Sequence, residues 1–515
     1  MVCEDPLGFG GLVPVKLNDL ISTISSRLND KHIENLKKIV EISKRFHKMA
    51  KIPVRNVDIS EESVVLESGH QPNFFPYSGV WRKVFLLDYI SERLTEIGRE
   101  VVPVFGLFDF NLCTARLLFQ NRVPAVNKDG FVTIGLRKPS GLNIWRRFNS
   151  IEKPTEEDWE KVVNRIKDIY RNASREILEV IIEEMWKSYE LGKTLSDVNA
   201  ILFSRLCSLF GFDVLFFRYS DVQRCGLFVE EWRRIVSRLK EFNRIYNEIV
   251  MRRGLENDLG LVEENMAPFW YHCECGAKVQ MYHDGEFFGI CPICKREHGI
   301  ASFEDEFKDI SPRAVPRNLI FSEGMGTSLF ISGAGGGLKY GMVADEIAGR
   351  FGFNRPITLV WVGRDYYLGL AHRQMLKEMM RLFDMKFDDL LDRNVALSKV
   401  RDKRKSLARM VNSSDDRLRQ RYIGQYIYSE TQLKIAGSMF SITPSILDIL
   451  MTFGFERVAN AWKDALNGID VMGGEFYKIE ADIHYEDNVS KIYDVVRILS
   501  DKSKEIDPLG LLGGG

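Results

Sequence analysis

The chain has 515 residues, a length that predicts about two or three domains rather than one. Its 71 lysines and arginines nearly balance its 72 aspartates and glutamates, so the bulk charge singles out neither a nucleic-acid nor a membrane partner. No apolar run approaches the roughly 20 residues that a membrane helix needs, and the acidic N-terminus lacks the pattern of a secretory signal. We therefore expect a cytoplasmic protein without a membrane partner.

The first part of the chain contains a strand, a polar loop and a helix in close succession. Residues 15–50 have the apolar spacing of one or two helices. Residues 64–66 suit a buried strand, the loop 68–76 contains two prolines, and helical periodicity resumes near Gly79. A second β-branched run follows at 101–106. A strand, a helix and a strand within about 45 residues predict a βαβ unit and a parallel sheet.

The middle of the chain alternates between apolar and helical patterns. Residues 115–150 alternate in places and predict a segment of β-strands, and residues 156–191 predict a long helix. Residues 213–217 predict a buried strand, and residues 230–253 a charged amphipathic helix. Further on, two apolar runs at 318–321 and 328–331 flank a glycine-rich turn, 357–362 suits another buried strand, and the sequence from residue 370 onward is almost entirely helical.

These patterns predict an α/β fold. We expect a Rossmann-like core with a parallel sheet over residues 1–370, a zinc ribbon inserted at 271–298, and a helical, coiled-coil-like C-terminal domain over 371–515. We also expect the helical region to pair two chains in a homodimer. Its apolar stripes include Ile446, Leu447, Leu450 and Met451.

Four of the eight cysteines form a cluster in the sequence. Cys273-x-Cys275 and Cys291-x-x-Cys294 have the spacing of two zinc knuckles, each at a turn that contains glycine or proline. Four thiolates complete a tetrahedral site and leave no open position, so we expect structural rather than catalytic Zn²⁺. The other cysteines are scattered and form no disulfide framework.

A polar loop follows the first predicted strand. It contains His70, Gln71 and Asn73, and Lys83 lies a little further along, in the helix that follows. A strand, a polar loop and a helix N-terminus form the usual ligand-binding corner of an open α/β sheet. The alternative is an ordinary turn before a capped helix.

A glycine-rich segment, SGAGGGLKY at residues 332–340, lies between a predicted strand and a helix. Glycines allow a ligand to approach the backbone, and a helix N-terminus favours an anion. Leu338 occupies the position where a Walker A loop or a G-x-G-x-x-G motif requires glycine. A tight turn permitted by glycine is therefore an open alternative to a nucleotide site.

The basic run at 399–421 is a third candidate. Basic helices bind phosphates, but aspartates interrupt this run and it has no aromatic residue before Tyr422. A solvated helix face, or half of a coiled-coil pair, is the favoured interpretation.

The order of these motifs resembles the bacillithiol-biosynthesis cysteine-adding enzymes (the BshC family). In place of that family's T-G-Q-Q loop and following lysine, this chain has Ser68-Gly69-His70-Gln71 and Lys83. The family's V-P-V-F strand and acidic loop match Val102-Pro103-Val104-Phe105 and Asp109 of this chain. The family's G-G-P-G-E-x-x-Y turn matches Ser332-Gly333-Ala334-Gly335 and Tyr340. The family's strand ending in P-R matches Val362-Gly363-Arg364, and the resemblance covers most of 60–365.

The chain also departs from that family. His70 replaces the first glutamine, a glycine replaces the glutamate of the turn, where one residue is inserted, and the Gly-Pro after the Q-Q loop is missing. The zinc ribbon is not a feature of the family. The segment His70-Gln71-Pro72-Asn73, with Phe119-Gln120-Asn121-Arg122, is also similar to the WbqC-like family.

The resemblance implies a ligase that adds cysteine, or a related amine donor, to a small sugar-derived acceptor, with a nucleotide such as ATP or ADP bound nearby. It implies catalytic roles for Asp109 or His70 as the base that keeps the attacking amine neutral. Lys83 and Arg364 would hold a carboxylate or phosphate. The other implied substrate-binding residues are Gly69, Gln71 and Asn73, and the implied nucleotide-binding residues are Ser332, Gly333, Gly335 and Tyr340.

A parallel sheet would bring these positions together. The loops at 68–73, 106–111, 332–337 and 363–365 all follow predicted strands, so we expect them to meet at the carboxyl edge of the sheet. The competing hypothesis is an RNA- or tRNA-binding, or otherwise non-catalytic, interaction protein built from the zinc ribbon and the basic helix. Under the preferred hypothesis we expect no nucleic-acid partner.

Overall fold

The structure of the chain, a computed structural model, describes residues 13–300 and 306–502. The helices are α1 (Leu17–Thr23), α2 (Asp30–Ala50), α3 (Ser78–Glu96), α4 (Glu156–Ile169), α5 (Arg175–Leu191), α6 (Leu195–Leu209), α7 (Tyr219–Arg224), α8 (Val229–Val236), α9 (Leu239–Arg252), α10 (Glu256–Leu259), α11 (Ala314–Met325), α12 (Gly336–Phe351), α13 (Leu370–Phe383), α14 (Arg393–Ser413), α15 (Asp416–Ser441), α16 (Ile446–Leu466) and α17 (Val489–Asp501).

The strands are β1 (Val13–Lys16), β2 (Val64–His70), β3 (Val101–Leu107), β4 (Gln120–Pro124), β5 (Phe131–Gly135), β6 (Leu215–Arg218), β7 (Met266–His272), β8 (Lys278–Asp284), β9 (Glu286–Ile290), β10 (Glu297–Ile300), β11 (Ile310–Pro312), β12 (Leu329–Ser332), β13 (Ile357–Val362), β14 (Asp365–Tyr366), β15 (Asp470–Gly473), β16 (Tyr477–Glu480) and β17 (Ile483–His484). Short 3-10 helices lie at Arg116–Leu118, Gly141–Trp145, Phe148–Ser150, Phe307–Asp309 and Phe387–Leu391.

An eight-stranded sheet forms the centre of the molecule, in the order β1-β15-β16-β13-β12-β2-β3-β6. The neighbouring strands from β16 to β6 all run parallel, whereas β15 is antiparallel to both β16 and β1. In chain order, β2, β3 and β6 extend to one side, and β12, β13 and β16 extend to the other. The direction of winding therefore reverses between β2 and β12. The prediction of an α/β fold with a largely parallel sheet is confirmed.

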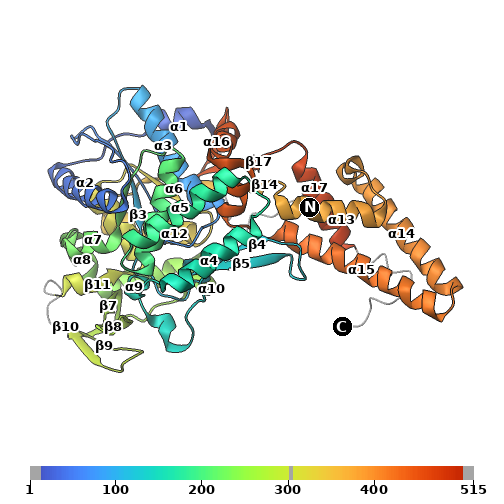
Figure 1. Cartoon of the computed structure of the whole chain (residues 1–515). Helices are drawn as coiled ribbons and strands as arrows, with labels where there is room; N and C mark the ends of the chain where they lie inside the picture. Colours follow the sequence, from blue (N-terminus) through green and yellow to red (C-terminus); the bar gives the residue numbers. More distant parts are fainter. Residues whose placement is uncertain (1–12, 301–305, 503–515) are drawn as a thin grey trace.

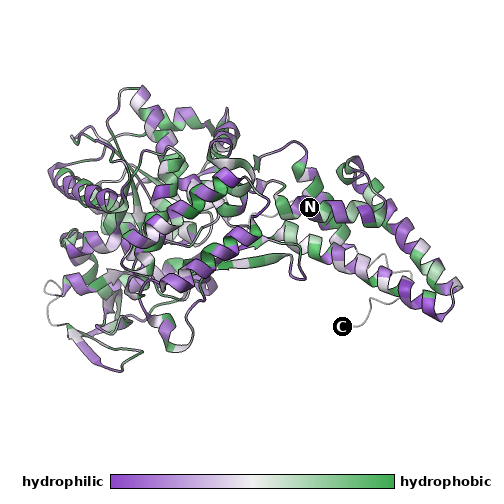
Figure 2. Ribbon diagram, in the orientation of Figure 1, coloured by the Kyte–Doolittle hydropathy of each residue, from purple (hydrophilic) through white to green (hydrophobic). Residues whose placement is uncertain are grey.

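The sheet has a hydrophobic core on each face. Val64 and Leu66 of β2 pack in one core with Trp81 of α3, whereas Val65 packs in the other core with Ile39 of α2. This alternation follows from the period of two in a strand, and it explains why β2 and β3 are apolar on both faces. Helices cover both sides of the sheet in Figure 1. The peripheral helices alternate purple and green in Figure 2, as amphipathic helices do.

A second sheet, in the order β10-β9-β8-β7-β11, is antiparallel and contains the four clustered cysteines at its turns. Its inward residues, including Phe269, Val279 and Phe287, belong to the same hydrophobic core as one face of the main sheet. The ribbon therefore rests on the central domain rather than standing apart from it.

The C-terminal part divides between two cores. Helices α13, α14, α15 and α17 share a core of their own, and α14 and α15 form an arm that projects from the rest of the molecule (Figure 1). Residues 446–480 return to the main sheet, because β15 and β16 are strands of it and α16 packs into its core. The predicted boundary at residue 370 thus does not separate two independent cores.

The apolar stripe on α16 has a different role from the one expected. Ile446, Leu447, Leu450 and Met451 are buried within the chain, against the core that also contains Trp81. They are therefore not available to pair with a second chain. Among the described residues, none of the helices combines the length and apolarity that crossing a bilayer requires.

Candidate functional site

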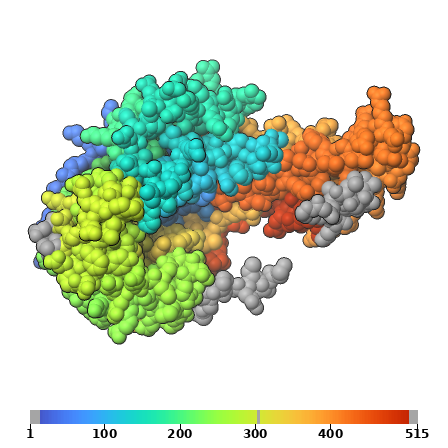
Figure 3. All heavy atoms as spheres, turned by 90° about the horizontal axis from the view of Figure 1, so that it is seen from below, coloured from blue at the N-terminus to red at the C-terminus, as the bar shows by residue number. Residues whose placement is uncertain are grey.

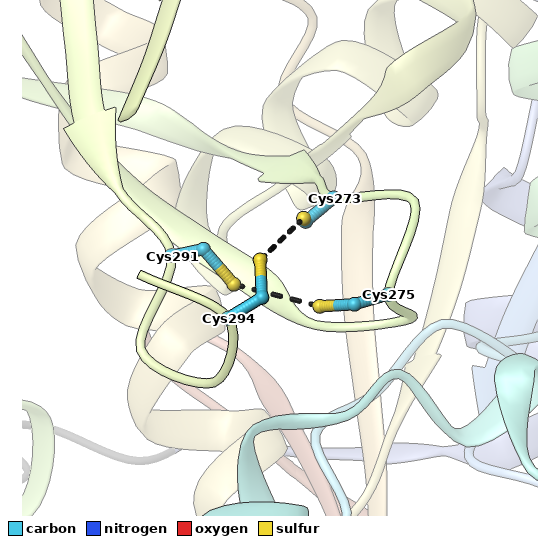
Figure 4. A group of neighbouring side chains, drawn as sticks. All are labelled: Cys273, Cys275, Cys291 and Cys294. Atoms are coloured by element: carbon cyan, nitrogen blue, oxygen red, sulfur yellow. Dashed lines mark hydrogen bonds between the residues drawn. The ribbon is translucent and has the colours of Figure 1, made fainter. Parts of the chain in front are cut away.

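The four cysteines of the ribbon converge on one point. Cys273 and Cys275 lie in the turn between β7 and β8, and Cys291 and Cys294 in the turn between β9 and β10. Their sulfur atoms all lie within 4.8 Å of one another, and the side chains point toward a common centre in Figure 4. The Sγ–Sγ distance is 3.6 Å between Cys273 and Cys294 and 3.5 Å between Cys275 and Cys291.

These distances fit a tetrahedral metal site. Sulfurs that each lie about 2.3 Å from a central Zn²⁺ are separated by about 3.8 Å. The neighbouring His272 is engaged elsewhere, since its Nε2 lies 2.8 Å from the Ser311 hydroxyl and its Nδ1 3.2 Å from the Arg147 guanidinium. The four-cysteine cluster is confirmed, and it is compatible with a structural metal such as zinc.

A cavity of about 580 Å³ opens at the carboxyl ends of β2 and β12, where the winding of the sheet reverses. Its walls come from the loop after β2, the start of α11, the segment after β12, and ribbon residues of β7 and β8. In Figure 3 the surface is hollowed between the yellow-green ribbon and the green segment that precedes it. Open α/β sheets bind their ligands at such a reversal point, and the volume suits a small molecule.

The cavity contains eight of the eleven residues that the sequence suggested for substrate, nucleotide or catalysis. They are Gly69, His70, Gln71, Lys83, Ser332, Gly333, Gly335 and Tyr340. Residues as far apart in the sequence as positions 69 and 340 therefore meet in one cavity, as the parallel sheet predicts. Asn73, Asp109 and Arg364 are not among its lining residues.

Those three residues make contacts outside the cavity. Asp109 is buried, and its carboxylate accepts hydrogen bonds from the backbone N–H of Ser220 (3.0 Å), from the Ser220 hydroxyl and from the Asn149 amide (3.3 Å).

Arg364 donates to the carbonyl of Phe440 and stacks over the ring of Tyr493 at 5.1 Å, whereas Asn73 is buried in the turn after β2. Asp109 thus fixes the start of α7, and Arg364 joins the sheet edge to α15.

His70 is uncharged in its surroundings. Burial, and then the nearby Lys83, lowers its pKa to about 3. Its Nδ1 lies 2.9 Å from the carbonyl oxygen of Gln71, which can only accept, so Nδ1 carries the proton. The other ring nitrogen, Nε2, is therefore left as an acceptor.

Lys83 is the second unusual group. It is buried on α3 and donates to the carbonyl oxygen of Gly69. Burial, and then the charge of Arg317, lowers its pKa to about 7. An amine with such a pKa changes its charge near neutral pH.

The cavity is also lined by three cations that the sequence did not indicate. They are Lys278, Arg313 and Arg317. Lys278 is the first residue of β8 and donates to the carbonyl oxygen of Phe110 at 3.1 Å. Arg313 donates to the side-chain amide oxygen of Gln280, and Arg317 lies 3.8 Å above the ring of Phe108. Burial lowers the pKa of all three.

Arg313 and Arg317 lie at the N-terminal end of α11, as its N-cap and in its first turn. The helix dipole disfavours cations there, so negative charge nearby would make this placement more favourable. The position of these two arginines at a helix N-terminus is the one signal in the sequence that could have revealed them.

The lining has a strong imbalance of charge. Lys83, Lys278, Arg313 and Arg317 face this space, and no aspartate or glutamate is among its described lining residues. The Nε atoms of Arg313 and Arg317 and the Oε1 of Gln71 are buried and have no hydrogen-bond partner in the described part of the chain. We call this space the cationic cavity.

The glycine-rich segment closes one side of the cationic cavity, at the N-terminus of α12. A Cβ added to Gly333 or Gly335 would meet no protein atom within 4 Å, so packing does not require glycine at either position. Gly69 differs, because a Cβ there would lie 2.7 Å from the carbonyl oxygen of Gly106 and 2.7 Å from the ring of Phe108. The glycine at position 69 has a packing role.

Comparison of the chain with protein-family models gives no match, and neither does comparison with curated proteins.

Proposed function

We propose that the cationic cavity is the active site of an enzyme that acts on a small anionic molecule. The observation that carries this proposal is the convergence of four cations on one cavity whose described lining contains no carboxylate. Burying four cations against mostly neutral oxygens is costly, and an anionic ligand would compensate that cost. The winding order of the six parallel strands, with its reversal at β2 and β12, supports a Rossmann-like core.

We further propose the reaction class that the sequence resemblance implies. A ligase of this kind would join cysteine, or another amine donor, to a sugar-derived acceptor, with ATP or ADP bound near the glycine-rich segment. The four cations would hold phosphate or carboxylate groups. The acceptor would be activated by phosphoryl transfer from ATP, and the amine would form the new C–N bond as phosphate leaves that carbon. The unprotonated Nε2 of His70 would accept the proton that the amine loses, and its low basicity would rise once an anion neutralises the cations around it.

Two roles change from those implied by the resemblance. Asp109 would act indirectly, by holding the start of α7, because it does not line the cationic cavity. Arg317 and Lys278 would take the anion-holding role expected of Arg364.

Binding of candidate anions to the purified protein tests this proposal. Isothermal titration calorimetry with ADP, ATP, pyrophosphate and glucose 6-phosphate should detect at least one ligand. Arg317→Met should weaken that binding by about tenfold or more, the loss of one charge-assisted contact. Arg175→Met is the matched control, because Arg175 is 90% exposed. Binding of none of these anions, or equal binding by both variants, would contradict the proposal.

A second candidate function, RNA binding, is favoured by the surface of the arm. On α14 and α15, Arg393, Arg401, Lys403, Lys405, Arg409, Arg417 and Arg421 are all exposed. Cations in such a row attract the phosphate backbone, and binding should weaken steeply as salt rises from about 50 to 200 mM. Fluorescence anisotropy with a labelled tRNA would test this, with Lys403→Glu/Lys405→Glu as the variant. Salt-independent or absent binding would exclude the RNA hypothesis.

A further inference from the structure

The ribbon contributes a wall to the cationic cavity as well as a metal site. Lys278 follows the first knuckle directly, three positions after Cys275, and lies in the lining with Trp270 of β7. Its Nζ lies 5.5 Å from the centre of the Trp270 ring and 5.3 Å from that of Phe110. The side chain is therefore held between the ribbon and the loop after β3.

Lys278 pairs with His272 in the antiparallel β7–β8 ladder, and hydrogen bonds around Gly276 hold the turn that precedes it. Within the turn, the backbone N–H of Gly276 donates to Cys273 O (2.9 Å), and that of Cys273 donates to Ala277 O (3.0 Å). From outside, the Arg147 backbone N–H and the Ser150 hydroxyl donate to Gly276 O, at 2.8 and 3.1 Å.

These bonds lie within the first knuckle and its outer contacts, and a bound metal would add a link between the two knuckles through the four cysteines. A bound metal would hold the four sulfurs as thiolates around one centre and so close the two knuckles against each other.

We propose that the four-cysteine centre positions Lys278 for anion binding, so that the bound metal and the anion in the cationic cavity stabilise each other. The inference rests on the proposed function, because it requires the cavity to bind an anion. Linkage makes the effect reciprocal: metal raises the affinity for the anion, and the anion slows the loss of the metal by the same coupling.

The alternative is a ribbon that serves folding only. In that case metal loss would lower stability, but Lys278 would contribute nothing to affinity beyond its share of the cavity surface. The two possibilities differ in whether the effects of removing the metal and removing the Lys278 charge are additive.

The experiment measures binding of ADP and of pyrophosphate by calorimetry in four states of the protein. These are the metal-loaded wild type, the wild type after chelation, metal-loaded Lys278→Met, and Lys278→Met after chelation. We expect Lys278→Met to weaken binding about tenfold and chelation of the wild type to weaken it at least as much. Chelation of Lys278→Met should then cause a clearly smaller further loss.

A second readout uses the metal alone. Release of zinc to a chromogenic chelator should be slower in the presence of ADP for the wild type, but not for Lys278→Met. Any zinc binding by ADP in solution would affect both proteins equally. Methionine keeps the apolar stem of the lysine and removes a buried charge, so the variant should fold, and circular dichroism checks this.

The outcomes separate the two proposals. If neither ADP nor pyrophosphate binds to the metal-loaded wild type, the proposed anion site fails and the inference falls with it. If the wild type binds and Arg317→Met does not, but Lys278→Met and chelation leave the affinity unchanged, the cavity proposal stands and the coupling is wrong. Additive losses from Lys278→Met and chelation also overturn the coupling.

Discussion

Individual side chains in the cationic cavity have pKa values that differ from those of the same residue types exposed to solvent. Lys83 has a pKa of about 7 because it is buried and because Arg317 is close. In the folded, ligand-free protein it therefore loses its proton far below the pH at which an exposed lysine would. A bound anion would favour the charged form and return the pKa toward its ordinary value.

The first prediction concerns this titration. Above about pH 7, binding of an anion must be accompanied by uptake of a proton by Lys83, so affinity should fall as the pH rises, by up to tenfold per unit. Calorimetry with ADP between about pH 7.5 and 9 avoids the ionisation of the terminal phosphate. Lys83→Met should bind more weakly at low pH and show a shallower profile, because Lys278 also has a lowered pKa, whereas Lys403→Met, an exposed control on the arm, should follow the wild type.

The stability of the ligand-free protein provides an independent check with the opposite sign. Between about pH 7 and 10.5 the unfolded chain keeps the Lys83 proton and the folded chain does not, so this residue makes stability increase with pH in that window. Urea denaturation should show that Lys83→Met lacks this increase. An unchanged pH slope in the variant would contradict the lowered pKa.

Residues differ in how far the sequence reveals them. His70 and Gln71 are recognisable because they interrupt an apolar strand with polar groups at a turn that contains proline. Lys278 and Arg317 look like ordinary surface cations, since their burial depends on segments more than a hundred residues away, such as the loops around Gly69 and Phe108. Apart from the position of Arg317 at a helix N-terminus, local pattern carries no information about such contacts.

At the scale of elements, the loop between β12 and α12 is the clearest candidate for a backbone binding surface. Its glycines are not required by packing at Gly333 or Gly335, in contrast to Gly69. Glycine there suits a ligand that approaches the backbone closely.

We therefore predict that Gly333→Ala folds normally, with stability equal to the wild type or higher by about 0.4–1 kcal/mol, and that it binds ADP at least tenfold more weakly. Gly69→Ala should show the reverse order of effects, with a marked loss of stability, because its Cβ would collide with Gly106 and Phe108. Thermal denaturation and calorimetry on both variants test this. Normal ADP binding by Gly333→Ala would exclude the loop as the nucleotide site.

The ribbon is the element that the sequence specifies best, because cysteine spacing alone determines its two turns. Its apolar residues nevertheless merge with the core of the main sheet, which spacing does not predict. Loss of metal should therefore be a local event. Cys273→Ser should reduce the zinc content from about one ion per chain to near zero and increase amide hydrogen exchange mainly across β7–β10. Elemental analysis that finds no zinc in the freshly purified wild type would contradict the metal assignment.

Other elements show the limits of sequence patterns. The strands β2, β3, β6, β12 and β13 are predictable, because each is an apolar or β-branched run buried on both faces. The strands β15 and β16 are not, since DVMG and YKIE are short, partly polar segments within a helical region. Only the tertiary structure determines that they complete the main sheet.

At the scale of the whole molecule, residues 446–480 return to the main sheet, and helices α14 and α15 project as an arm. The arm of α14 and α15 projects from the main body, and a buried ion pair between Arg404 and Glu430 joins its two helices. Its outer surface keeps several apolar side chains exposed. They are Val395, Met410, Leu418, Ile427 and Tyr428.

The last prediction is that this arm pairs with the arm of a second chain, so that the protein is a homodimer. The apolar stripe on α16 is buried and cannot form the contact. The exposed apolar residues of the arm can, with Phe387 as the other large exposed hydrophobic residue described in this region. Light scattering at micromolar concentration should give twice the chain mass of 59.4 kDa. Leu418→Glu/Ile427→Glu should give a monomer that still binds ADP, because the cationic cavity lies in the main body. Leu142→Glu, at an exposed apolar residue away from the arm, should remain dimeric. A wild-type protein with the mass of a single chain would show that the arm has no such role.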